Sequence, residues 1–99
     1  MKIKSDLELA KYDNAILEVR TDINILDEKI VELLKQRFQL VMQAEEIKQV
    51  DELPHLSKER EQVVLENVTF GLSGAQRSYV QEVYQQILAS SRELNGITQ

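Results

Sequence analysis

A repeating pattern of apolar residues in the first half of the chain constrains the fold more than any other feature. From residue 16 onward an apolar side chain recurs every three or four positions, which is the a/d seam of a helix that packs against other helices. No glycine or proline interrupts this register, so we predict one long helix over about 13–50, capped by Asp13 or Asn14. The seam positions are, in order, Ile16, Val19, Ile23, Leu26, Ile30, Leu33, Arg37, Leu40, Ala44 and Ile47.

The few glycines and the single proline divide the rest of the chain. Pro54 predicts that the first helix ends before it, because proline disfavours helical backbone in the residue that precedes it. Gly71 and Gly74 bracket a short turn. Two further helices are therefore expected, at about 57–70 and 74–95.

Serine residues mark the expected starts of these two helices. Ser57 and Ser73 are predicted N-caps, because a serine side chain can accept a hydrogen bond from an orphan backbone N–H. Residues 1–12 have no clear periodicity and are expected to form a loosely docked N-terminal extension. The remainder, 13–99, is predicted to be a single helical domain.

The expected length of the first helix implies that it has a partner outside its own chain. About 38 residues at ~1.5 Å each extend for ~57 Å, whereas a compact domain of this size has a radius of gyration of ~13 Å. The two shorter helices cannot cover the whole seam, although burying one Leu or Ile contributes roughly 1.5–3 kcal/mol. The predicted fold class is therefore all-α, with one very long helix, and two chains are expected to form an intertwined helical homodimer.

Composition argues against several classes of protein. Lys+Arg 12 against Asp+Glu 17 gives a net charge of −5, which argues against a dedicated binder of nucleic acid or of an anionic membrane. The absence of cysteine removes disulfides and cysteine-ligated zinc, and the one histidine cannot form a histidine-rich metal site. There is no signal-peptide core and no apolar run near the ~20 residues of a membrane span. We expect a cytoplasmic protein with no metal or cofactor.

Two cations on the first predicted helix suggest an anion site. Arg37 occupies a seam position, and Lys48 follows three helical turns later, within ~20° of the same direction and ~16 Å along the axis. Arg20 lies ~100° around the helix and ~25 Å from Arg37, so the two guanidiniums cannot meet on a small ligand within one straight helix, but Arg20 of one chain could reach the Arg37 site of the other in an antiparallel dimer. The alternative for each residue is an ordinary solvated cation.

Polar residues on the other two helices have both a functional and an ordinary explanation. Arg60-Glu61 opens the second helix and could be an exposed ion-pair face. Ser91 and Asn95 are four positions apart on the core side of the third helix, and Asn95 could simply be part of a C-cap. Because no phosphate-binding glycine loop, Ser/His/Asp set or HExxH motif is present, the chemistry left open is positioning and electrostatic stabilisation.

The spacing of these residues resembles that of the all-helical (AroQ-type) chorismate mutases. An arginine is followed by a Leu-Asp pair, then by Leu-Leu and a second arginine. The resemblance covers about residues 15–96. The residues that carry it are Arg20, Leu26-Asp27, Leu33-Leu34, Arg37, Lys48, Arg60-Glu61 and the segment 89–95.

The resemblance implies an intertwined dimer with two equivalent sites that rearrange chorismate to prephenate, a cofactor-free pericyclic step of the shikimate pathway and aromatic amino acid biosynthesis. By position, Arg37 and the other chain's Arg20 would clamp the two substrate carboxylates. Lys48 would face the ether oxygen of the breaking bond. Glu61 would accept the ring hydroxyl, with Arg60 as a supporting residue.

The same resemblance assigns roles near the C-terminus and reveals departures from the family pattern. Ser91 would help to hold a carboxylate. Asn95 stands where well-known bacterial members have a glutamine that donates to the ether oxygen, so its donor falls back by ~1.3 Å. Ser57 replaces a frequent aspartate as a possible substrate contact, and Arg92 replaces an apolar residue that often lines the pocket.

Three alternatives to a chorismate mutase follow from the same residues. An isochorismate-pyruvate lyase would use the same fold and the same cations. A catalytically weakened homologue would bind an aromatic metabolite or a partner enzyme in a regulatory role. A structural coiled-coil dimer would leave Arg37 in the seam, and the matches at Lys48 and Arg60-Glu61, without an explanation.

Overall fold

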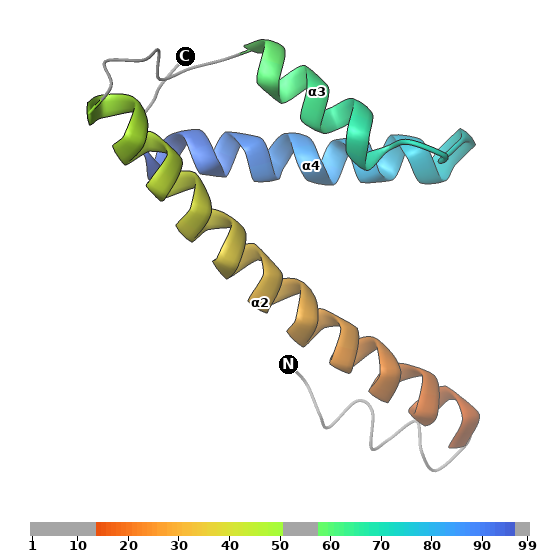
Figure 1. Ribbon diagram of the computed structural model, residues 1–99. Coiled ribbons are helices and arrows are strands. Elements are labelled where there is room, and N and C mark those ends of the chain that lie inside the picture. Colours follow the sequence, from red (N-terminus) through yellow and green to blue (C-terminus); the bar gives the residue numbers. More distant parts are fainter. Residues whose placement is uncertain (1–13, 51–57, 97–99) are drawn as a thin grey trace. The chain divides into compact units, whose positions relative to one another are not determined.

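The computed structural model describes residues 14–50 and 58–96, and these residues form three helices (Figure 1). The helices are α2 (Asn14–Val50), α3 (Lys58–Val68) and α4 (Gly74–Leu94). No strand occurs among the described residues. The all-α fold class predicted from the sequence is confirmed.

Helix α2 runs for 37 residues without a break. It begins one residue after the predicted start, at Asn14, and ends at Val50 as predicted. Four other expectations from the sequence fall on residues outside the described part of the chain. These are the Asp13 cap, the Pro54 break, the Ser57 cap and the extension 1–12.

The apolar seam of α2 is largely exposed in the single chain. Leu33 and Leu40 keep 62% and 63% of their surface accessible, although leucine is among the residue types most often buried. The other large apolar side chains of the seam that are exposed are Ile16, Val19, Ile23, Leu26, Ile30 and Ile47. A contiguous apolar stripe of this kind is typical of a surface that another molecule covers.

Helices α3 and α4 lie side by side and run in opposite directions (Figure 1). Val64 of α3 and Leu88 of α4 are buried. Val68 and Tyr84 are half-buried on the same helix faces, since residues three or four positions apart share a face of a helix. This antiparallel hairpin therefore has a small apolar core of its own.

The turn between α3 and α4 makes α3 end earlier than its sequence suggests. The helix was expected to reach residue 70 but stops at Val68. The backbone N–H of Phe70 donates to the carbonyl of Asn67 at 3.3 Å, and that of Leu72 to the carbonyl of Thr69 at 3.0 Å, so the chain tightens into successive turns. Gly71 follows at φ 79°, a backbone conformation that favours glycine.

The chain divides between Arg37 and Phe38 into two compact units. The first contains most of α2, and the second contains the end of α2 together with α3 and α4. No helix in the described ranges combines the length and the apolar character that crossing a membrane requires.

Candidate functional site

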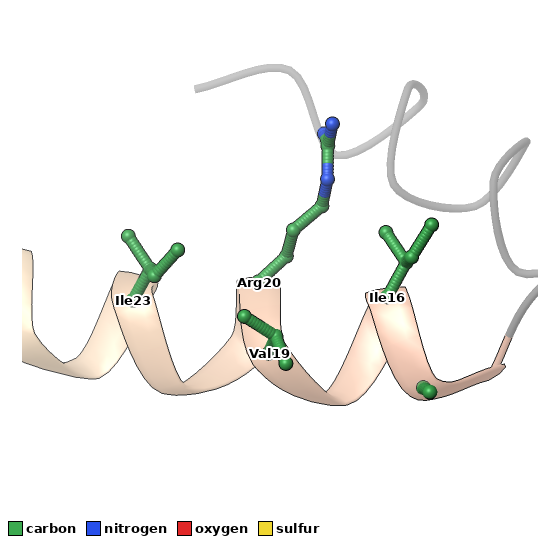
Figure 2. A pocket seen from close by; sticks show the side chains of 5 residues that line it. Ile16, Val19, Arg20 and Ile23 are labelled. Atoms are coloured by element: carbon green, nitrogen blue, oxygen red, sulfur yellow. The ribbon is translucent and has the colours of Figure 1, made fainter.

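Arg20 belongs to the first unit and extends from an apolar surface of α2. A shallow hollow on this surface is lined by Arg20 together with Ala15, Ile16, Val19 and Ile23. Figure 2 shows the Arg20 side chain extending from the same side of the helix as Ile16 and Ile23. Since Ile16 and Ile23 are seam residues, the guanidinium is presented beside the exposed apolar stripe.

Arg37 and Lys48 are the other two cations that the sequence singled out on α2. Both are half-buried, so Arg37 is less exposed than its seam neighbours Leu33 and Leu40. Lys48 lies in the last turn of α2, where the negative end of the helix dipole favours a cation. Partial removal from water strengthens the electrostatic interaction of such cations with an anion.

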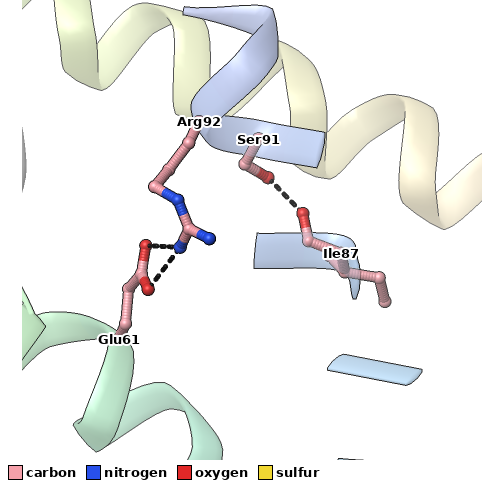
Figure 3. A network of polar contacts seen from close by, with 4 residues as sticks. All are labelled: Glu61, Ile87, Ser91 and Arg92. Carbon is pink, nitrogen blue, oxygen red and sulfur yellow. Dashed lines mark hydrogen bonds and ion pairs between the residues drawn. The ribbon is translucent and has the colours of Figure 1, made fainter. Parts of the chain in front are cut away.

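Glu61 of α3 is held by Arg92 of α4. The Arg92 Nη1 atom donates to both carboxylate oxygens of Glu61, at 2.5 Å each (Figure 3). The side chains are only 23% and 25% exposed, so water screens this ion pair less than it would on an open surface. The pair joins residues that are far apart in the sequence.

The direction of the two helices explains why these charges meet. Glu61 lies in the first turn of α3 and Arg92 in the last turn of α4. In an antiparallel hairpin the N-terminal end of one helix lies beside the C-terminal end of the other. The helix dipoles therefore favour an anion at the position of Glu61 and a cation at the position of Arg92.

Ser91 is buried on α4, and its hydroxyl is engaged within the helix. The hydroxyl donates to the carbonyl of Ile87 at 2.9 Å (Figure 3). A serine hydroxyl has one proton to donate, but its oxygen has two lone pairs. To donate to a ligand carboxylate, the Ser91 hydroxyl must rotate away from the Ile87 carbonyl.

Asn95 and Arg60 lie at helix ends. Asn95 is the C-cap of α4, and its backbone N–H donates to the carbonyl of Ser91 at 3.3 Å. The C-cap explanation of Asn95 is therefore confirmed for its backbone, while the role of its half-buried side chain stays a prediction. Arg60 is exposed in the first turn of α3, and Ser57 lies outside the described residues.

Two features of this region had not been expected from the sequence. The ion pair between Glu61 and Arg92 joins two helices, and nothing in the local sequence shows which of several cations a given carboxylate meets. Glu45 is buried on α2, although glutamate is rarely buried and this residue is followed by a second glutamate. The positions of the seam residues in the sequence gave no indication that Glu45 would be buried.

The structure therefore brings Glu61 and Arg92 together on the α3–α4 hairpin, while the hydroxyl of the neighbouring Ser91 bonds within α4. Of the other predicted site residues, Arg20, Arg37 and Lys48 lie on α2, Arg60 lies on α3 and Asn95 follows α4, whereas Ser57 lies outside the described residues. Among the residues that the structure describes, no group of three or more His, Cys, Asp or Glu side chains is arranged to hold a metal ion.

Comparison with known families shows which family the sequence matches. The family model for chorismate mutase type II matches residues 19–96, which include α3, α4 and all but the first turn of α2. No curated protein and no solved structure matches the chain. Because the match extends over most of the sequence and the structure is all-helical, the chain belongs to the chorismate mutase type II family.

Proposed function

We propose that this protein catalyses the rearrangement of chorismate to prephenate. The observation that carries the proposal is the family match over 19–96, and this range contains the four charged residues that the resemblance assigns to the site. These residues are Arg20, Arg37, Lys48 and Glu61. The chemistry suits a chain without a thiol nucleophile, because the reaction forms no covalent intermediate with the enzyme.

The reaction is intramolecular, so the enzyme has to hold one conformation and stabilise one charge distribution. The ether C–O bond of chorismate breaks while a new C–C bond forms in the same molecule, and no atom is gained or lost. Negative charge develops on the ether oxygen as its bond to carbon lengthens. Lys48 is proposed to face that oxygen, with Asn95 as a second donor, because donors aimed at a developing charge lower the barrier.

The two substrate carboxylates require cations at a fixed separation. Arg37 is proposed to bind one carboxylate, and Arg20 of the partner subunit to bind the other, because a guanidinium presents two parallel donors to a carboxylate. The exposed seam of α2 supports this assembly. A second copy that covered the seam would bury the apolar side chains around Arg20 and bring that guanidinium to a site on the other chain.

The remaining groups are proposed to contact the ring and one carboxylate. Glu61 accepts the ring hydroxyl, and Arg60 supports it from the same turn of α3. Ser91 donates to a carboxylate once its hydroxyl leaves the Ile87 carbonyl. Ser57 is proposed as a further contact at the start of this region.

The first test is the loss of chorismate absorbance with purified protein. We expect turnover by the wild-type chain and at least a ~10²-fold lower kcat/KM for Arg37→Ala, since that change removes a carboxylate clamp. Lys35→Ala is the matched control, because it removes an exposed cation from the same helix. Its kcat/KM should equal that of the wild type. Undiminished activity of Arg37→Ala would disprove the assignment of Arg37.

A folded wild-type protein without chorismate turnover would contradict the proposal as a whole. The shorter Asn95 side chain and the engaged Glu61 carboxylate would then favour the catalytically weakened homologue that binds an aromatic metabolite. Assay of isochorismate with release of pyruvate as the readout would identify the lyase. The isochorismate assay therefore separates the lyase from the catalytically weakened homologue.

A further inference from the structure

The ion pair of Glu61 and Arg92 differs from an ordinary surface salt bridge in its environment. The pair of Lys35 and Glu32 on α2 has a distance of 3.6 Å and side chains that are 67% and 59% exposed. In the Arg92 pair the distance is 2.5 Å and each side chain is about three-quarters covered. Exposed pairs often contribute little because water and salt screen them, so the two pairs are expected to behave differently when their cations are removed.

The geometry of the pair leaves Glu61 able to accept another hydrogen bond. An ionised carboxylate has about four acceptor positions on its two oxygens. Arg92 Nη1 approaches both oxygens, and one lone pair on each oxygen remains for another donor. Glu61 can therefore stay paired with Arg92 and still accept a hydroxyl of a ligand.

The charge of the pair also matters for a dianionic ligand. A lone carboxylate at the position of Glu61 would repel the two carboxylates of the substrate, and this repulsion is larger where water is partly excluded. Arg92 balances that charge within the pair. The negative charge of Glu61 then does not weaken the attraction between the cations of the site and the substrate carboxylates.

We propose that Arg92 is a positioning residue that holds the Glu61 carboxylate and balances its charge, so that Glu61 accepts the substrate hydroxyl beside two substrate carboxylates. This inference rests on the proposed function. It gives a role in the site to Arg92, which replaces the expected apolar residue. In this role Arg92 does not contact the substrate. Its effect on the reaction must therefore pass through Glu61.

A double-mutant cycle tests this dependence. The four proteins are the wild type, Arg92→Met, Glu61→Gln and the double variant, each assayed for kcat and KM with chorismate. Methionine keeps the unbranched stem and the helix propensity of arginine but removes the charge. We expect Arg92→Met to lower kcat/KM by at least ~10-fold in the wild-type background, with both a lower kcat and a higher KM, and by less than about 3-fold in the Glu61→Gln background.

The controls separate positioning from a purely structural role. Lys35→Met likewise replaces the cation of the exposed ion pair with methionine and should leave kcat and KM unchanged. Arg92→Lys keeps a positive charge near Glu61 and should restore kcat/KM part of the way toward the wild type, which loss of a structural contact alone does not explain. If circular dichroism shows that Arg92→Met has lost helix content, Arg92→Lys replaces it in the cycle.

Two outcomes of the kinetic cycle would overturn the inference. Unchanged kcat and KM in Arg92→Met, with only a lower melting temperature, would make the pair structural. An effect of equal size in the Glu61→Gln background would show that Arg92 acts on the substrate directly. If the wild type itself does not turn over chorismate, the proposed function fails. The cycle is then measured from the Kd for chorismate by calorimetry, where additive effects would overturn the role of Arg92.

Discussion

Asn95 lies where helix α4 stops, and this position limits what its side chain can do. Its backbone closes the helix by donating to the Ser91 carbonyl, so its Cα is fixed relative to the last turn. The Asn95 side chain is one methylene shorter than that of glutamine, and a shift of this residue alone cannot make up the lost reach of its amide. The reach of the amide is therefore set by the length of the side chain.

We predict that Asn95→Gln raises kcat for chorismate by up to about 10-fold, because the longer side chain brings its N–H nearer to the ether oxygen. Asn95→Ala, which removes the donor, should lower kcat by about 10²-fold. Steady-state kinetics of both variants provides the measurement. A large loss in Asn95→Gln would show that the asparagine is fitted to its own helix end, and equal rates for all three proteins would remove Asn95 from the chemistry.

At the scale of elements, one arginine of α4 contacts α3 and the other contacts the turn that follows α3. Arg92 binds Glu61 at the open end of the hairpin, whereas Arg77 Nη1 donates to the carbonyl of Thr69 at 3.0 Å in the turn. Thr69 is buried at 2% exposure, and its hydroxyl donates to the carbonyl of Leu65 at 2.7 Å. One arginine therefore serves the proposed site, while the other stabilises the end of α3.

We predict that Arg77→Met lowers the free energy of unfolding by about 1 kcal/mol, because the buried turn loses a charge-assisted hydrogen bond to the Thr69 carbonyl. The measurement is urea denaturation at a fixed protein concentration, since unfolding of an oligomer depends on concentration. Lys35→Met, in an exposed ion pair, should change stability by less than about 0.5 kcal/mol. Equal stability of Arg77→Met and the wild type would show that the Thr69 carbonyl is satisfied in another way.

At the scale of the whole molecule, the single chain covers little of its apolar surface. Among the described residues, Val64 and Leu88 are the buried apolar side chains, whereas the seam of α2 is exposed along most of its length. A chain of this size buries only part of its surface when it folds alone. Pairing of two α2 helices is the proposed way in which the seam is covered and Arg20 reaches the partner's site.

We predict that two inactive variants restore each other's activity when they share a dimer. If Arg20 crosses between subunits, a heterodimer of Arg20→Ala and Arg37→Ala has one site with both arginines intact and one site with neither. After the two variants are mixed, unfolded in urea and refolded, random pairing should recover about one quarter of the wild-type activity. Chorismate turnover of the refolded mixture is the measurement.

The matched control for this experiment mixes Arg37→Ala with Lys48→Ala. Both of these residues are proposed to serve the site of their own chain, so every site in the heterodimer lacks one of them and no activity should return. Recovery in the control mixture, or failure of the first mixture to recover, would contradict the assignment of Arg20 to the partner's site.

The sequence was sufficient for those features that depend on local periodicity. The uninterrupted seam from Ile16 to Ile47 predicted α2 to within one residue of its start, because an apolar side chain every three or four positions favours only a helix. The end of α3 was predicted too late. Apolar residues continue to Phe70, but Phe70 is 88% exposed in a turn that backbone hydrogen bonds around Thr69 determine.

For the candidate site, the sequence by itself determined which residues carry charge and where each one lies along its helix, since both follow from residue type and helical geometry. Arg20, Arg37 and Lys48 were identified in this way. Only the tertiary structure decided that Glu61 meets Arg92, because the contact depends on how α3 and α4 are aligned across the turn. An ion pair between helices is set by packing, which no local pattern of residues records.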